Sequence, residues 1–285
     1  MKFEHTTIRA TDGFELAATV FEPDGGQSAT PLVIINSAMG VKRRYYEKFA
    51  SFLAEQGCTA ITYDYRGIGD SRPRHLRGFS ARLTEWGEKD FTGVLAWALG
   101  RKHFSRISLV GHSVGGQIVG LSPHNEHLAA LVFVAAQSGD WRTWDGMGQM
   151  RMWLLWHAMI PGLCGVYGYL PGWSGIGEDV PKGVALEWAT WGRRPHYILG
   201  GADLAARKPG FDRVRTSLTA FSFADDNYAP RRAVEALLGF YAQAGISHHH
   251  VRPGENGLPN VGHFGFFREK FKDSLWQQTL TALQI

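Results

Sequence analysis

The chain has 285 residues, of which 44% are hydrophobic and 20% charged, and its 30 Lys and Arg against 26 Asp and Glu give a net charge of +4. Its 17 Phe, 10 Trp and 9 Tyr supply ample apolar surface for a buried core, which excludes an intrinsically disordered chain. A charge of +4 over this length is too weak to indicate a nucleic-acid-binding surface, so no nucleic-acid partner is predicted.

The cysteines and histidines do not form the spacings typical of metal sites. Cys58 and Cys164 are far apart in the sequence and lack the CxxC spacing of a zinc or redox site, and no disulfide scaffold is indicated. His248, His249 and His250 fall in a predicted strand, where alternation sends the middle side chain to the opposite face. We therefore expect no metal and no cofactor.

Two segments bear on location. Residues 1–12 include several charged side chains and lack the apolar run of a secretory signal, so a cytoplasmic location is expected. Residues 152–177 contain no Asp, Glu, Lys or Arg and are long enough to span a bilayer. Pro161, Pro171 and six glycines are expected to break any helix there, and no transmembrane span is predicted.

The order of apolar runs and turn residues predicts strands that alternate with helices. An antiparallel strand pair is expected at 3–9 and 14–21, around the turn Asp12-Gly13. Strand and helix then alternate, which predicts βαβ crossovers and a mostly parallel sheet with helices on both faces. Further strands are predicted at 32–35, 59–63, 107–110, 128–135, 217–223 and 248–251, and helices at 45–56, 91–99, 114–121, 231–241 and 266–283.

The alternation stops between Gln137 and Arg215. This segment holds seven of the ten tryptophans and four of the six methionines, and it has no clear strand pattern. We interpret it as an insertion into an α/β domain. The predicted core domain therefore comprises residues 1–136 and 216–285, and the predicted cap or lid comprises residues 137–215.

The most specific local motif is Gly111-His112-Ser113-Val114-Gly115, between a predicted strand and a predicted helix. A serine on such a sharp turn needs small neighbours, because its strained backbone approaches the strand and helix closely and projects the hydroxyl outward. The alternative is a glycine-rich turn with an ordinary N-cap serine. The flanking strand and helix favour a nucleophilic Ser113.

A nucleophilic serine requires a base and a group that orients the base. In this topology the acid follows a later strand and the histidine comes last in the chain. Asp225 and Asp226 follow the predicted strand 217–223, and His263 precedes the terminal helix. Either aspartate suits the role of the acid by position. The other would then be an ordinary turn or capping residue.

Together these motifs resemble the α/β-hydrolase superfamily, in particular serine hydrolases that include monoacylglycerol-lipase-like esterases. The resemblance implies a mostly parallel sheet of about eight strands with a helical cap inserted after the sixth. It also implies Asp226 as the acid, because Pro230 follows it by four positions. The residues that carry the resemblance are 44–50, 64–71, 111–115, Asp226 with Pro230, and Gly262-His263.

The loop after the third strand departs from the family pattern. Family members often carry His-Gly here, whereas this chain has Asn36-Ser37-Ala38-Met39. An oxyanion hole needs two backbone N–H groups and no particular side chain. By position these are the N–H groups of Val114 and Ala38, with Met39 as the substitute for Ala38.

The insertion and the basic loops suggest where a substrate lies. Tryptophans and methionines recur at roughly helical spacing in the insertion, which fits either core packing or an apolar substrate pocket. Loop arginines and lysines near the same edge form either a solvated rim or a surface that attracts anions. The predicted pocket residues are Met39, Trp141, Trp144, Trp153 and Trp156, and the basic residues are Lys42, Arg43, Arg44, Arg66, Arg72, Arg74, Arg77 and Arg82.

The sequence thus predicts a serine hydrolase that cleaves a small-molecule carboxylic ester, or a thioester, through Ser113, His263 and Asp226 and an acyl-enzyme intermediate. Two alternatives remain: an acyltransferase with the same triad, and a catalytically idle member of the fold that binds ligands. Amide cleavage also stays open. The natural substrate, the oligomeric state and the mobility of the cap do not follow from the sequence.

Overall fold

The computed structural model describes residues 2–25, 29–101 and 103–285, and its centre is one eight-stranded sheet. The strand order is β1-β2-β4-β3-β5-β6-β9-β10. The β1–β2 and β2–β4 pairs are antiparallel, whereas all later pairs are parallel, as predicted. The strands are β1 (Lys2–Arg9), β2 (Glu15–Glu22), β3 (Thr30–Asn36), β4 (Thr59–Tyr63), β5 (Phe104–His112), β6 (Ala130–Val134), β9 (Ser217–Phe223) and β10 (Gly245–Val251).

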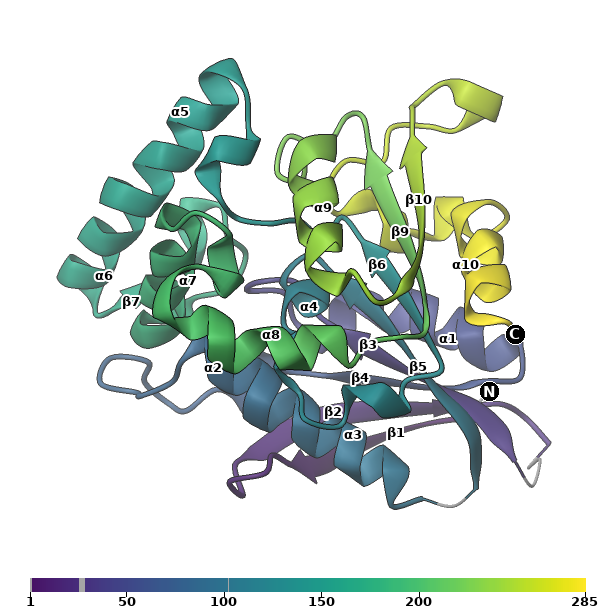
Figure 1. Ribbon diagram of the computed structural model, residues 1–285. Helices are drawn as coiled ribbons and strands as arrows, with labels where there is room; N and C mark the ends of the chain where they lie inside the picture. The colour runs from purple at the N-terminus through teal and green to yellow at the C-terminus, as the bar shows by residue number, and fades with distance from the viewer. Residues whose placement is uncertain (1, 26–28, 102) are drawn as a thin grey trace.

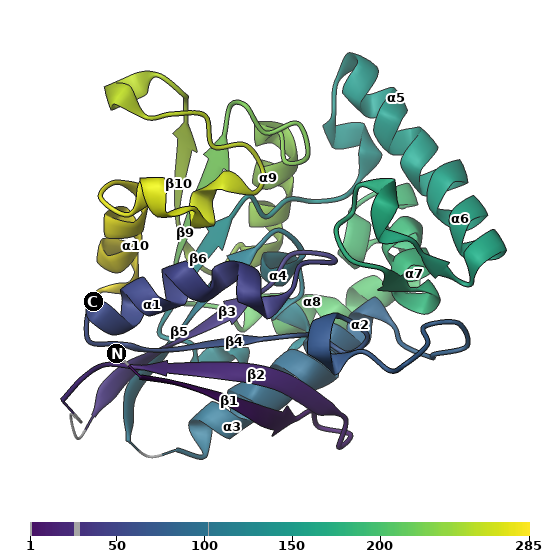
Figure 2. The same ribbon diagram turned by 180° about the vertical axis from the view of Figure 1, so that it is seen from behind.

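The central strands are buried on both faces because helices cover the sheet from two sides. Every residue of β4 and β6 is buried, which explains why β6 is a continuous apolar run rather than an alternating pattern. Helices α1 and α10 lie on one face, and α3, α8 and α9 lie on the other (Figures 1 and 2). Their bounds are α1 (Glu47–Glu55), α3 (Thr92–Leu99), α8 (Leu204–Asp212), α9 (Arg231–Leu238) and α10 (Leu275–Leu283).

The segment between β6 and β9 contributes no strand to the main sheet. Its helices α5 (Gly146–Leu154), α6 (Ile160–Tyr167) and α7 (Lys182–Arg193) stand together at one side of the molecule in both views (Figures 1 and 2). It also contains a short antiparallel pair that the sequence did not predict, β7 (Tyr169–Leu170) and β8 (Val180–Pro181).

Helical structure continues through Pro161, where we expected a break. A π-helical turn, Leu155–Met159, joins α5 to α6, and Pro161 falls in the first turn of α6. Pro161 is the second residue after the π-helical turn, which interrupts the regular i→i−4 hydrogen-bond pattern, so the missing N–H of proline is tolerated there. No helix in the described part of the chain is long and apolar enough to cross a bilayer.

The last helix is shorter than predicted. Helix α10 begins at Leu275 rather than near Phe266, and two short 3₁₀ turns, Gly265–Phe267 and Glu269–Phe271, precede it. The indole N–H of Trp276 donates to the carbonyl oxygen of Phe266 at 2.7 Å. Because the Trp276 side chain occupies the Phe266 carbonyl oxygen, the two 3₁₀ turns are favoured over one long helix from Phe266.

Candidate active site

Ser113 lies on a strained turn between β5 and the short helix α4 (Val114–Gln117), with φ of 52° and ψ of −116°. The turn brings backbone segments so close that side chains do not fit beside it. A Cβ atom at Gly111 would lie 2.8 Å from the backbone of Gly116, and one at Gly115 would lie 2.3 Å from the carbonyl oxygen of Asn36. Both glycines of the G-x-S-x-G motif are thus explained by close approach.

The structure brings together the three residues that the sequence assigns to a triad. The Ser113 Oγ lies 3.1 Å from Nε2 of His263, and Nδ1 of His263 lies 2.8 Å from Oδ2 of Asp226. The second carboxylate oxygen of Asp226 accepts the backbone N–H groups of Tyr228 and Ala229 at 2.8 and 3.0 Å. All three triad side chains are buried, and each follows the carboxyl end of a parallel strand.

The neighbouring aspartate has a different contact. Oδ2 of Asp225 accepts the backbone N–H of Val261 at 2.9 Å, and no contact joins Asp225 to His263 in the described residues. Asp225 therefore ties the loop after β9 to the loop that carries His263. This is the backbone-binding role that the sequence left open for one of the two aspartates.

Gln137, which the sequence analysis missed, contacts the serine hydroxyl. The Ser113 Oγ lies 3.4 Å from Oε1 of Gln137, whose side-chain N–H donates to the carbonyl oxygen of Tyr228 at 3.2 Å. The backbone carbonyl of Gln137 accepts from the Gln117 amide at 2.8 Å. Its place directly after β6, at the edge where sites form in parallel sheets, was the available signal.

His112 joins three loops of the site. Its Nε2 lies 2.9 Å from the backbone oxygen of His263, which only accepts, so Nε2 carries the hydrogen. Nδ1 then accepts from the Tyr46 hydroxyl at 2.8 Å, and the same hydroxyl accepts the Ala38 N–H at 2.9 Å. One buried imidazole thus connects the serine turn, the histidine loop and the loop after β3.

Burial holds the pKa of His112 well below its usual range, and the positive charge that His263 acquires on protonation lowers it further. The imidazole is fully buried and stays neutral in the folded protein. Protonation would also put a hydrogen on Nδ1 of His112, which must accept the hydroxyl hydrogen of Tyr46 while that hydroxyl accepts the Ala38 N–H.

This burial predicts a pH-dependent stability. Because the folded-state pKa is lowered, the unfolded chain binds the extra proton first, and stability falls as the pH drops below the ordinary histidine value. We expect this group to cost about 1.4 kcal/mol of unfolding free energy per pH unit in that range. Urea denaturation at several pH values between 7 and 5 should give a shallower decline for His112→Gln than for the parent. Equal slopes would contradict the prediction.

The same network changes the expected oxyanion donor. The Ala38 N–H, predicted for this role, already donates to Tyr46 and is not free to bind an oxyanion. Within the described residues, the N–H groups of Met39 and Val114 donate no hydrogen bond to the protein. Tyr46 lies in the motif segment 44–50, but its hydroxyl was not predicted to accept the Ala38 N–H.

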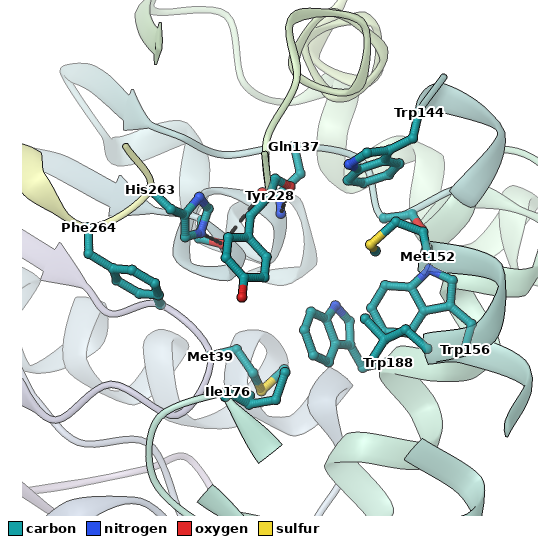
Figure 3. Close-up of a pocket in the computed structure, with 15 residues that line it drawn as sticks. Met39, Gln137, Trp144, Met152, Trp156, Ile176, Trp188, Tyr228, His263 and Phe264 are labelled. Atoms are coloured by element: carbon teal, nitrogen blue, oxygen red, sulfur yellow. Dashed lines mark hydrogen bonds between the residues drawn. The ribbon is translucent and has the colours of Figure 1, made fainter. Parts of the chain in front are cut away.

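A small chamber of about 50 Å³ lies beside Ser113 and His263. Of the predicted pocket residues, Met39, Trp144 and Trp156 line it. In Figure 3, His263, Tyr228 and Gln137 lie on one side and Trp144, Met152, Trp156 and Trp188 on the other. The lining residues that the sequence analysis did not name as pocket residues include Gln137, Gly139, Met152, Leu155, Gly175, Ile176, Trp188, Tyr228 and Phe264.

Trp141 and Trp153 lie outside the chamber, contrary to expectation. Trp153 is 44% exposed and stacks on His157 with ring centroids 4.6 Å apart. The Trp141 ring packs against the core beneath the Arg142 guanidinium. The π-helical turn that starts at Leu155 changes the phase of the helix, so Trp153 and Trp156 do not share a face.

A larger groove of about 960 Å³ adjoins the chamber. It runs between α5 and the loop that follows β9, and it includes Met147, Leu154, Asn227 and Pro230. Trp144, Met152, Leu155, Gly175, Ile176 and Tyr228 line both cavities.

The basic loop residues include two that form no rim at all. Arg43 and Arg66 are only 4% exposed. Arg66 is paired with Asp12 and Asp90. Burial raises the pKa of Asp90 to about 6. Neither arginine is available to attract an anionic substrate. Other pairs are Arg43 with Asp64 and Asp70, Arg72 with Asp179, Arg82 with Glu187, and Lys42 with Glu178.

Sequence comparison finds relatives that match part of the chain. An uncharacterized 31.7 kDa protein from Escherichia coli is 31% identical over 103 residues, which is 35% of each chain. The sn-1-specific diacylglycerol lipase ABHD11 of Danio rerio is 27% identical over 112 residues, covering 39% of this chain and 32% of the relative. The chain thus spans about a third of the length of the curated relatives it matches.

Solved structures match over the whole length of the chain. The esterase Est1E from Butyrivibrio proteoclasticus, in a complex with ferulic acid, has a TM-score of 0.62 at 17% identity and covers 98% of this chain and 100% of its own. The esterase from Exiguobacterium antarcticum has a TM-score of 0.63 at 16% identity, and the match covers 99% of this chain and 100% of that esterase. At these identities the likeness shows the fold.

The model of the alpha/beta hydrolase family matches residues 32–270, from the start of the parallel sheet to the loop beyond His263. The match includes the serine turn and both loops that carry Asp226 and His263. This chain belongs to the alpha/beta hydrolase family.

Proposed function

We propose that this protein is a serine hydrolase that cleaves carboxylic esters through an acyl-enzyme intermediate. The observation that carries the proposal is the continuous contact from the Ser113 hydroxyl to His263 Nε2, and from His263 Nδ1 to the Asp226 carboxylate. A serine hydroxyl is a weak nucleophile at neutral pH, and this chain supplies the base and the group that orients it.

In the proposed reaction, Ser113 Oγ attacks the ester carbonyl carbon while His263 Nε2 takes the hydroxyl proton. The tetrahedral intermediate collapses, the bond to the alcohol oxygen breaks, and His263 returns the proton to that oxygen. Water, deprotonated by His263, then attacks the acyl-enzyme. The bond between the acyl carbon and Ser113 Oγ breaks, His263 returns the proton to Oγ, and the acid is released. Asp226 keeps the hydrogen on Nδ1 of His263 throughout.

The proposed oxyanion hole consists of the N–H groups of Met39 and Val114. The substitution of Met39 for Ala38 rests on the Tyr46 hydroxyl, which already accepts the Ala38 N–H. Val114 is the first residue of α4, so its N–H has no acceptor within the helix, and the helix N-terminus favours negative charge.

We also propose that residues 137–215 form a cap, with residues 1–136 and 216–285 as the core domain. The support is that side chains from this segment, among them Trp156 and Trp188, line the chamber beside Ser113. The likeness to esterases and to a diacylglycerol lipase supports an ester substrate. The cytoplasmic location stays a prediction.

Labelling with a fluorophosphonate followed by peptide mapping tests the nucleophile. We expect one labelled peptide, with the modification on Ser113, and release of p-nitrophenol from p-nitrophenyl acetate that the label abolishes. A label on another residue, or hydrolysis that survives full labelling of Ser113, would overturn the proposal. Product analysis with an added alcohol acceptor separates hydrolysis from acyl transfer.

A further inference from the structure

We propose that the site is built for esters of a short acyl group, two to four carbons long, with a large apolar alcohol. This inference rests on the proposed function and names its substrate class. It follows from the unequal size of the two cavities and from Tyr228, which lines both of them and lies beside His263.

The chamber beside Ser113 is small. Its volume of about 50 Å³ holds roughly four water-sized groups, since each needs about 10–15 Å³ by this measure. An acetyl or butyryl chain matches this volume, whereas an octanoyl chain would extend beyond it. The groove, at about 960 Å³, accommodates a much larger group.

The wall of the chamber resists expansion. Trp156 is fully buried, its indole N–H donates to the carbonyl oxygen of Gly139 at 2.9 Å, and its ring packs edge-on against Trp188 at 4.6 Å. A Cβ at Gly192 would lie only 2.5 Å from the Trp156 ring, so the ring is packed on its far side as well. Forcing a longer chain into such a packed site displaces side chains at a cost.

The proton transfer fixes which part of the ester lies in which cavity. His263 must protonate the departing alcohol oxygen, so the alcohol lies on the histidine side. The groove is lined on that side by the loop of Asp226, through Asn227 and Tyr228, and the Tyr228 ring lies 5.4 Å from the His263 ring. Trp144 and Tyr228 line both cavities and mark their junction. The alcohol therefore extends past Tyr228 into the groove, and the acyl group stays in the chamber.

The groove presents apolar side chains to this alcohol. Met147 and Leu154 of α5 are 62% and 53% exposed, and Met159 of the π-helical turn also lines the groove. Burying an apolar chain against these residues gains free energy for each methylene. Flexible methionine side chains adapt to alcohols of different shape.

The first arm of the test varies the acyl group with a constant leaving group. With p-nitrophenyl acetate, butyrate and octanoate, we expect kcat/KM to fall at least tenfold from butyrate to octanoate. The second arm varies the alcohol with a constant acetyl group, using acetates of primary alcohols from ethanol to octanol, whose leaving-group acidities are similar. Here kcat/KM should rise by up to about fourfold per methylene, the full-burial limit.

Three variants separate the two cavities. Trp188→Ala should shift the acyl optimum towards octanoate, and Trp188→Phe, which preserves more of the packing, should shift it less. Met147→Ala should flatten the alcohol series and leave the acyl series unchanged. Trp153→Ala is the matched control and should change neither series. Trp153 lies in α5, as Met147 does, but its exposed side chain lines neither cavity.

The outcomes distinguish this inference from the function on which it rests. If no ester of either series is hydrolysed, the proposed function fails. If esters are hydrolysed but octanoate is as good as butyrate, or alcohol length has no effect, only the assignment of the cavities is overturned.

Discussion

Replacement of Ser113 by alanine should lower ester turnover by about six orders of magnitude, the loss typical of removing a triad nucleophile. The hydroxyl is the only group that forms the acyl bond in the proposed reaction, and no other residue replaces it. The measurement is kcat for p-nitrophenyl acetate, together with fluorophosphonate labelling of the same preparation.

The matched control is Ser247→Ala, which removes a hydroxyl from the exposed face of β10 and should retain the parental rate. Folding of both variants is compared by circular dichroism and thermal unfolding. A folded Ser113→Ala protein with more than about a hundredth of the parental turnover would exclude this serine as the nucleophile.

Substitution of Asp226 by asparagine should lower turnover by about four orders of magnitude. The asparagine amide still fits between His263 and the N–H groups of Tyr228 and Ala229, but it favours the imidazole tautomer with the hydrogen on Nε2. In that tautomer, Nε2 cannot accept the serine proton. The fold is retained, so the loss appears in kcat.

Asp225→Asn is the built-in comparison, since the two carboxylates are adjacent in the chain and differ in their partners. An asparagine oxygen at position 225 still accepts the Val261 N–H, so we expect less than about a tenfold loss. If Asp225→Asn proves the more damaging change, the acid of the triad is Asp225, and the 2.8 Å contact between Asp226 and His263 is structural.

Much of the fold was predictable because the parallel strands carry an unambiguous pattern. The strands predicted at 59–63 and 217–223 have the bounds that the structure gives to β4 and β9, Thr59–Tyr63 and Ser217–Phe223. Chain order and the serine motif located the residues that meet at Ser113. These signals are local, and they do not depend on how distant segments pack.

What the sequence could not supply depends on packing and on helix phase. The π-helical turn at Leu155–Met159 leaves no clear mark in the residue pattern, yet it places Trp156 in the chamber and Trp153 in solvent. Likewise, no residue pattern indicates that the Tyr46 hydroxyl accepts the Ala38 N–H, because that contact forms only when the chain folds and His112 accepts the hydroxyl hydrogen. The burial of Arg43 and Arg66 has the same origin.

The connection from β6 to β9 allows substrate preference to change in evolution while the main sheet stays the same. These two strands are hydrogen-bonded neighbours, so the whole of residues 137–215 is one crossover between adjacent strands. Ser113, Asp226 and His263 all lie outside it, whereas Trp156 and Trp188 lie within it. Shortening, lengthening or exchanging this single crossover alters the cavities without breaking a strand pairing of the eight-stranded sheet. Recombination between relatives at two neighbouring sites would then transfer substrate preference as a unit.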